Sequence, residues 1–137
     1  MLTRFSALTS DQKATIIFHS GQIHADLGEN EKALERFAKS YDDTLNSKYH
    51  WNLFVDGTIA FIKKDKSKLI TARDEVEKAE KDHPYVKTLG NLIKCFGKPY
   101  KEVGLGCEKG SVPGYRDWET FNKITQCLNI KVGRAHV

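Results

Sequence analysis

The sequence lacks any apolar run near the roughly 20 residues that a transmembrane helix needs. Its first residues, MLTRFSALTSDQK, also lack the apolar core of about 7–15 residues and the small-residue cleavage site that define a signal peptide. These absences predict a chain that neither spans a membrane nor carries a secretory signal. With 39% hydrophobic and 29% charged residues, the composition is typical of one globular domain and not of a disordered chain.

Cysteine is scarce, with Cys95, Cys107 and Cys127 as the three in the chain. An odd number at wide spacing argues against a disulfide framework and favours a reducing compartment, so we expect a cytoplasmic protein. Cys95 and Cys127 lie on or beside apolar stripes, which indicates core residues rather than nucleophiles. Cys107 lies in a glycine-rich segment without an activating group, and its reactivity stays open.

The motifs of common catalytic and metal sites are also missing. No C-x-x-C or H-E-x-x-H occurs, and His19 and His24 are five residues apart, which puts them on different faces of a helix. The segment from Gly104 to Gly110 lacks both phosphate-loop glycine patterns, and no strand pattern precedes it. No nucleophile, base and oxyanion donor come together. The sequence therefore predicts a protein that is not an enzyme and has no metal or cofactor.

Apolar residues recur at helical spacing along most of the chain, and no strand pattern of comparable length is present. Thr9 and Gln12 have the spacing of a capping box at the start of the first helix, and Asp65 is placed to cap the fourth. We therefore predict an all-α fold. The expected helices span residues 10–27, 30–45, 48–63, 66–81, 84–96 and 115–129, with a short helix after Pro99, a loop over 107–114 and a tail over 130–137.

Glycines repeat with a regular spacing. Gly21 and Gly28 are seven residues apart, and Gly90 and Gly97 repeat this interval 69 residues later, or two units of about 34.5. Because a glycine inside a helix costs about 1 kcal/mol relative to alanine, Gly21 indicates close packing at that point. The middle unit fits with Gly57 aligned to Gly21, or with another frame that aligns Trp51 with Ile17, and both frames stay open.

At these positions the chain resembles the tetratricopeptide repeat family. The matching residues are Ile17, Gly21, His24, Gly28, Ala33, Phe37 and Ser40. The resemblance implies a right-handed superhelix of about three antiparallel helix pairs in a single domain over residues 1–137, with repeats at about 14–47, 48–82 and 83–107. It also implies that the helix over 115–129 caps the end of the stack, because a terminal repeat must hide its apolar face. The capping residues would be Trp118, Phe121, Ile124 and Leu128.

In that family the first helix of each pair lines a concave groove, and helical phase identifies the residues that would face it. The predicted groove residues are Phe18, Gln22, Asn52, Asp56, Lys87, Asn91 and Lys94; in the other frame of the middle unit, Phe54 and Thr58 replace Asn52 and Asp56. Some family members hold a partner's C-terminal carboxylate with lysine and asparagine residues, and Lys87 and Asn91 have the matching spacing. The other repeats offer no equivalent lysine, so we expect a weaker hold on an acidic peptide rather than a full carboxylate clamp.

Charge is divided unevenly along the chain. Residues 84–137 contain nine Lys or Arg against four Asp or Glu, whereas residues 1–83 contain thirteen against fourteen. The leading hypothesis is a non-enzymatic adaptor or scaffold that binds a protein or peptide in the groove. A nucleic-acid accessory protein is the second interpretation, less favoured because its basic residues are sparse. An oligomerisation module, with a second copy filling the groove, is the third. The candidate nucleic-acid contacts are Lys94, Lys98, Tyr100, Lys101, Lys109, Tyr115, Arg116, Lys123, Lys131 and Arg134.

Overall fold

The first described helix begins where the capping box predicts it. In the computed structural model, residues 7–107 are described, and α2 (Ser10–Asp26) begins after the N-cap residue Thr9. The Thr9 hydroxyl accepts from the Gln12 backbone N–H, and the Gln12 side chain accepts from the Thr9 N–H at 2.9 Å. Gly28 then ends the helix with a φ of +79°. Both ends of this helix therefore follow from local sequence signals.

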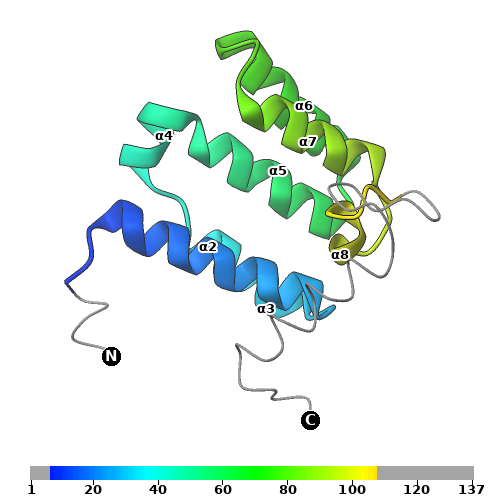
Figure 1. Cartoon of the computed structure of the whole chain (residues 1–137), viewed down its shortest axis with the longest axis horizontal. Helices are drawn as coiled ribbons and strands as arrows, with labels where there is room; N and C mark the ends of the chain where they lie inside the picture. The colour runs from blue at the N-terminus through cyan, green and yellow to red at the C-terminus, as the bar shows by residue number, and fades with distance from the viewer. Residues whose placement is uncertain (1–6, 108–137) are drawn as a thin grey trace.

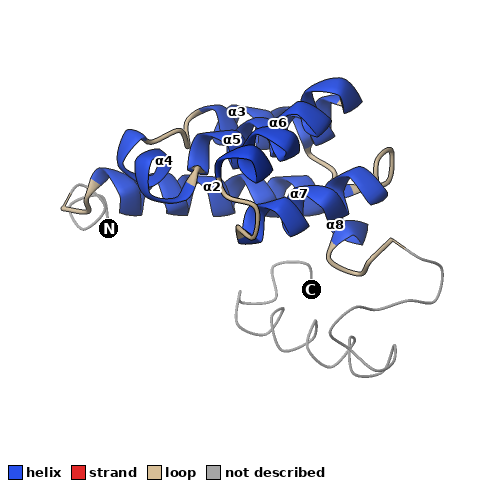
Figure 2. Cartoon of the chain, turned by 90° about the horizontal axis from the view of Figure 1, so that it is seen from above, coloured by secondary structure: helices blue, strands red, loops and turns tan. Residues whose placement is uncertain are grey.

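The described part of the chain is all helical and contains no strand. After α2 come α3 (Asn30–Ala38), α4 (Asp43–Tyr49), α5 (Trp51–Lys63), α6 (Lys66–Ala79), α7 (Pro84–Lys94) and the short α8 (Tyr100–Val103) (Figure 1). Seen from above, α3 and α6 lie on one side, and α2 and α7 lie on the other (Figure 2). The all-α prediction is therefore confirmed for these residues. The expected capping helix over 115–129 and the tail lie outside them.

The second predicted helix is shorter than expected. It was predicted to reach residue 45, but α3 ends at Ala38 and α4 starts anew at Asp43. Asp42 is the N-cap of α4, because its carboxylate accepts from the Leu45 backbone N–H at 2.9 Å. The Trp51 indole N–H donates to the Ser40 carbonyl at 2.6 Å, which occupies a carbonyl in the link between the helices. This tertiary hydrogen bond and the Asp42 cap together end the helix at Ala38, although the helical spacing of apolar residues continues to residue 45.

The third predicted helix also changes at its start. The spacing predicts a helix from residue 48, but α4 occupies that position, and His50 takes a left-handed φ of 59° between α4 and α5. The later boundaries match the sequence more closely. Asp65 caps α6 through the Lys68 backbone N–H at 3.2 Å, and Pro84 lies in the first turn of α7. Proline suits that position because the first amides of a helix need no intrahelical acceptor.

The core lies where α2, α3, α5, α6 and α7 meet. Gly21 allows α3 to approach closely, since a Cβ there would lie 2.7 Å from ring carbons of Phe37 and 3.3 Å from the Ala33 carbonyl oxygen. Gly57 has the same role in α5, where a Cβ would lie 2.5 Å from a methyl of Leu89. The largest fully buried apolar side chains are Phe18, Phe37, Val55, Leu69, Val76 and Leu89.

Candidate functional site

Phe18 is not available to a groove. Its side chain is 2% exposed and lies at the centre of an aromatic cluster. The ring centroids of Phe37, Trp51 and Phe54 lie 4.9, 5.0 and 5.2 Å from its own. The prediction that Phe18 lines a binding surface is therefore wrong. Helical phase identified the wrong face because the core of α2 is centred on Ala14, Phe18, Gly21 and Ala25 rather than on Ile17.

Gln22 and Asn52 both make structural hydrogen bonds. The Gln22 Nε2 donates to the Tyr100 hydroxyl at 3.0 Å and so joins α2 to α8. The pKa of Tyr100 is raised because its phenol is desolvated by burial. The Asn52 carbonyl oxygen accepts from the Asp42 backbone N–H at 3.0 Å, and the Asn52 N–H donates to the Asn46 side chain. Asn52 thus fixes the corner between α3 and α5.

Asp56 lies in a groove between α3, α5 and α6. This groove has a volume of about 570 Å³, and Leu53, Ile59 and Ala72 contribute apolar surface to it. The Tyr41 hydroxyl donates to the Asp56 carboxylate at 2.5 Å. Desolvation and this carboxylate raise the pKa of Tyr41 well above its ordinary value. Lysines and acidic residues both line the groove, so its charge does not clearly select either a positive or a negative ligand.

Lys87, Asn91 and Lys94 are exposed along α7, as the helical phase predicts. Neither the groove beside Asp56 nor the cavity described next includes any of these three residues. Of the seven predicted residues, Asp56 is the one that lines either of these two hollows. Whether the α7 stripe contacts a partner stays a prediction.

A second hollow lies where the C-terminal ends of α2 and α5 meet the turn between α7 and α8. Its volume is about 370 Å³. Among the described residues that line it are three lysines, Lys64, Lys98 and Lys101, and one acidic residue, Asp26. Ala25, Leu27, Phe61, Ile62 and Pro99 add apolar surface. We call this hollow the lysine-rimmed cavity; it combines an excess of positive charge with apolar side chains.

The titration of Asp26 follows from its position in this cavity. Desolvation raises the pKa of the Asp26 carboxyl above its ordinary value. A carboxylate at the last residue of a helix also faces the negative end of the helix dipole. Burial and the helix dipole thus disfavour the ionised form of Asp26, whereas the other charged residues in the described lining are lysines.

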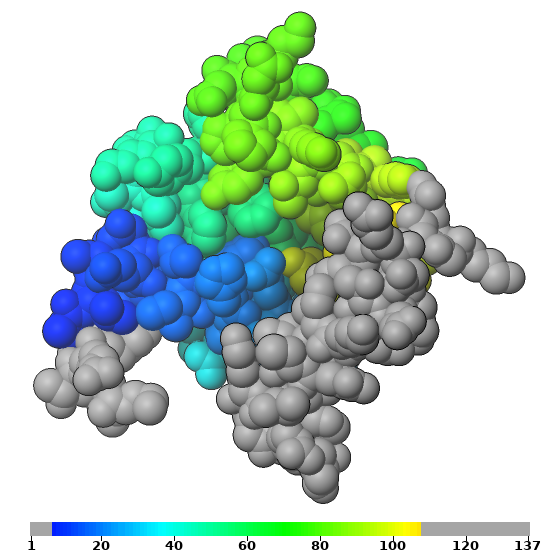
Figure 3. Space-filling view, viewed as in Figure 1, coloured from blue at the N-terminus to red at the C-terminus, as the bar shows by residue number. Residues whose placement is uncertain are grey.

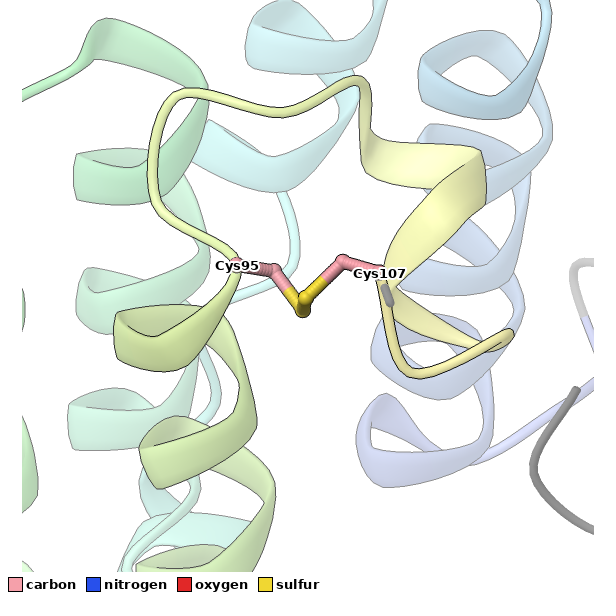
Figure 4. The surroundings of a disulfide bond; sticks show 2 residues. All are labelled: Cys95 and Cys107. Atoms are coloured by element: carbon pink, nitrogen blue, oxygen red, sulfur yellow. A yellow bond between two sulfur atoms is a disulfide. The ribbon is translucent and has the colours of Figure 1, made fainter. Parts of the chain in front are cut away.

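A disulfide closes the loop that supplies one side of the lysine-rimmed cavity. Cys95, at the end of α7, is bonded to Cys107 with a Cα–Cα distance of 5.6 Å (Figure 4). The loop that this bond closes contains five consecutive lining residues of the cavity, Gly97 to Lys101. The bond therefore holds the α7–α8 turn, and with it two of the three lysines, in place.

The disulfide overturns the prediction drawn from the cysteines. Their odd number and wide spacing argue against a disulfide framework, yet two of the three pair across the turn at Gly97, and Cys127 lies outside the described residues. Cys95 is a core residue as predicted, at 1% exposure. The expected cytoplasmic location rested on unpaired cysteines and loses that support, because disulfides persist mainly in oxidising compartments. Sequence spacing alone does not give the Cα–Cα distance that decides pairing.

The sequence identifies some of the residues that line this cavity. Lys98, Tyr100 and Lys101 were among the basic and aromatic residues of the C-terminal region, but Lys64 and Asp26 were not connected to them. They come together because Gln22 binds Tyr100 and brings α8 against α2. Nothing in the local sequence reports this contact, which joins residues 78 positions apart.

Other classes of site were sought in the same part of the chain. Within residues 7–107, no three His, Cys, Asp or Glu side chains are placed to hold a metal ion together. None of the helices described is both long and apolar enough to cross a membrane. Comparisons of the chain with protein families, curated proteins and solved structures found no match.

Proposed function

We propose that this chain is a non-enzymatic protein-interaction module that binds an acidic segment of a partner protein in the lysine-rimmed cavity. The observation that carries the proposal is the lining of the cavity, which combines Lys64, Lys98 and Lys101 with apolar side chains and one acidic residue. A peptide with acidic side chains flanking an apolar one would pair with the lysines and bury the apolar group.

The fold proposed with this function is a short tetratricopeptide-like superhelix. The hairpins α2–α3 and α5–α6, each with a small residue at the crossing, support this arrangement. The residues 83–107 would form the third unit, shortened because α8 has four residues. In such a stack, a partner binds to the helix and turn surfaces that are not buried in the core.

Nucleic acid is the less favoured partner for physical reasons. Phosphate backbones bind most strongly to extended basic surfaces, because affinity grows with the number of phosphates neutralised. The described lining of the lysine-rimmed cavity contains three lysines, too few to form such an extended basic surface. An acidic peptide needs fewer contacts and gains from the apolar side chains of the cavity.

The test is binding of a fluorescently labelled peptide of about a dozen residues, rich in Glu and Asp around two apolar positions, measured by anisotropy. Replacing both Lys98→Glu and Lys101→Glu turns two attractive contacts into repulsive ones, so the Kd should rise by roughly tenfold or more. The matched control is Lys81→Glu, an exposed lysine in the turn before α7 that is remote from the cavity in sequence and absent from its lining.

Three results would contradict this assignment. The first is equal binding by the double variant and the native chain. The second is loss of binding in Lys87→Glu but not in the double variant, which would transfer the site to the α7 stripe. The third is single-stranded RNA that displaces the peptide and binds more tightly, with an affinity that falls steeply between about 50 and 200 mM salt.

A further inference from the structure

The outer face of α2 is apolar although no described helix covers it. Ile16, Ile23 and Leu27 are 47%, 60% and 68% exposed. They are three of the five exposed large hydrophobic side chains of residues 7–107, and the intervals of seven and four place them on one face. We call them the α2 outer stripe. A concentration of this kind on one helix face is typical of a surface that contacts another segment.

The stripe lies opposite the core. Ile16 is two residues from Ala14 and from Phe18, which are both buried, and two residues correspond to about 200° around a helix. Ile23 has the same relation to Gly21 and Ala25. These side chains therefore cannot reach the core by a small rotation of α2. Figure 3 shows α2 at the surface of the described part of the molecule.

A shallow hollow continues the stripe at the start of α2. Its volume is about 340 Å³, and its lining is Leu8, Asp11, Gln12, Thr15 and Ile16. Ile16 belongs both to this hollow and to the stripe, so accessible apolar side chains occur at intervals from Leu8 to Leu27 along the helix. A single side chain would not cover a surface of this length, but a helix lying along α2 would.

The chain leaves the described part of the structure beside this helix. Tyr100 in α8 accepts a hydrogen bond from Gln22 of α2, and the disulfide at Cys107 fixes the last described residue close to α8 and the end of α7. The 10 residues between Cys107 and Trp118 reach up to about 35 Å when extended. The C-terminal residues can therefore reach either end of α2.

We propose that residues 115–129 form an amphipathic helix that lies along the α2 outer stripe. The two apolar faces match in length: at a rise of 1.5 Å per residue, Ile16 to Leu27 spans about 16 Å, and Trp118 to Leu128 spans about 15 Å. The apolar residues of the segment are Trp118, Phe121, Ile124 and Leu128. A 15-residue helix is marginal in water by itself, so it gains stability by burying this face on α2.

The experiment uses the full chain and measures hydrogen–deuterium exchange of residues 115–129. In the native chain these amides should be protected. Ile16→Ser combined with Ile23→Ser removes most of the stripe while leaving Leu27, which also lines the lysine-rimmed cavity, and exchange of the segment should accelerate by roughly tenfold or more. The helical core should be unchanged by circular dichroism, because both side chains are exposed. Tyr49→Ser, at an exposed aromatic on α4, is the matched control and should change nothing in the segment.

A reciprocal variant separates docking from helix formation alone. Phe121→Ser with Leu128→Ser should give the same acceleration and should also raise exchange in α2. Three outcomes would overturn the proposal: unprotected residues 115–129 in the native chain, protection that survives Ile16→Ser with Ile23→Ser, or a native dimer in sedimentation that this double variant dissociates. The last outcome would assign the stripe to a second copy of the chain.

Discussion

The α2–α3 hairpin and the α7–α8 region begin with the same glycine spacing but are held together differently. In the hairpin, Gly21 brings α3 so close that a Cβ would lie 2.7 Å from the Phe37 ring. In the C-terminal region no atom of the described residues lies within 4 Å of a Cβ at Gly90, the corresponding position, and a disulfide fixes the short α8 instead. The turn glycines are alike, with φ of +79° at Gly28 and +87° at Gly97.

The comparison separates two roles of glycine that look identical in sequence. A glycine after a helix is needed for its backbone conformation, which the turn itself imposes. A glycine inside a helix is needed only when another element approaches it. Phe37 on a nine-residue helix makes that approach to Gly21, whereas α8 has four residues and does not reach Gly90.

The largest effect should come from removing the residue that Gly21 accommodates. Phe37 is fully buried against Phe18, so Phe37→Ala should lower the free energy of unfolding by about 3–5 kcal/mol. Urea denaturation followed by circular dichroism measures this change. The counterpart in the other region, Tyr100→Phe, removes one hydrogen bond and should cost about 1 kcal/mol. Equal costs for the two variants would contradict the comparison.

The next effect concerns the disulfide. Breaking a bond that closes a loop of this size should cost about 3 kcal/mol, because the unfolded chain regains conformational freedom. Unfolding should therefore occur at lower denaturant concentration when a reductant is added to a Cys127→Ser background, which excludes exchange with the third thiol. Adding Cys107→Ser should lower stability by a similar amount and abolish the reductant effect. A native chain indifferent to reductant would show that the bond is absent in solution.

A smaller loss should follow Gly21→Ala. The new methyl would overlap the Phe37 ring, which the surrounding core restrains, so the overpacking should cost about 1–3 kcal/mol even after the gain in helix propensity. The thermal midpoint of unfolding should fall accordingly. A stabilised variant would mean that α3 moves away from α2 at little cost.

Gly90→Ala should have the opposite sign. With open space around Gly90 and a helical backbone, alanine should raise the free energy of unfolding by about 0.5–1 kcal/mol. The same denaturation measurement applies, with Gly21→Ala as its pair. Loss of stability here would show that a segment outside residues 7–107 lies against Gly90.

The smallest effect lies where the two regions meet, at Asp26. Because its folded-state pKa is raised, the folded state holds the proton more tightly, so stability falls as pH rises from the unfolded pKa through the folded pKa. Above that range Asp26→Asn should be more stable than the native chain by a few tenths of a kcal/mol, after allowance for solvent screening. Stability measured across the acid range tests this, and the difference should vanish at low pH.

The sequence predicted the helical fold and many helix ends, and it was less successful in showing which side chains are exposed. The caps at Thr9 and Asp65 and the turn at Gly28 depend on residues a few positions apart, so the sequence contains all the information they need. The end of α3 was missed because it depends on Trp51, eleven residues after Ser40. The predicted groove failed at Phe18 because a wheel of one helix does not show which face its neighbours cover.

By itself, the sequence determined which segments are helical, where most of them start, and that the C-terminal region is basic. Hydrogen bonds within one turn and the period of apolar residues decide these properties, and both are local. Only the tertiary structure decided that Cys95 pairs with Cys107 and that Lys64, Lys98 and Lys101 share a cavity with Asp26. Those groups meet because α8 packs on α2, and the distance between packed helices is not encoded in any single segment.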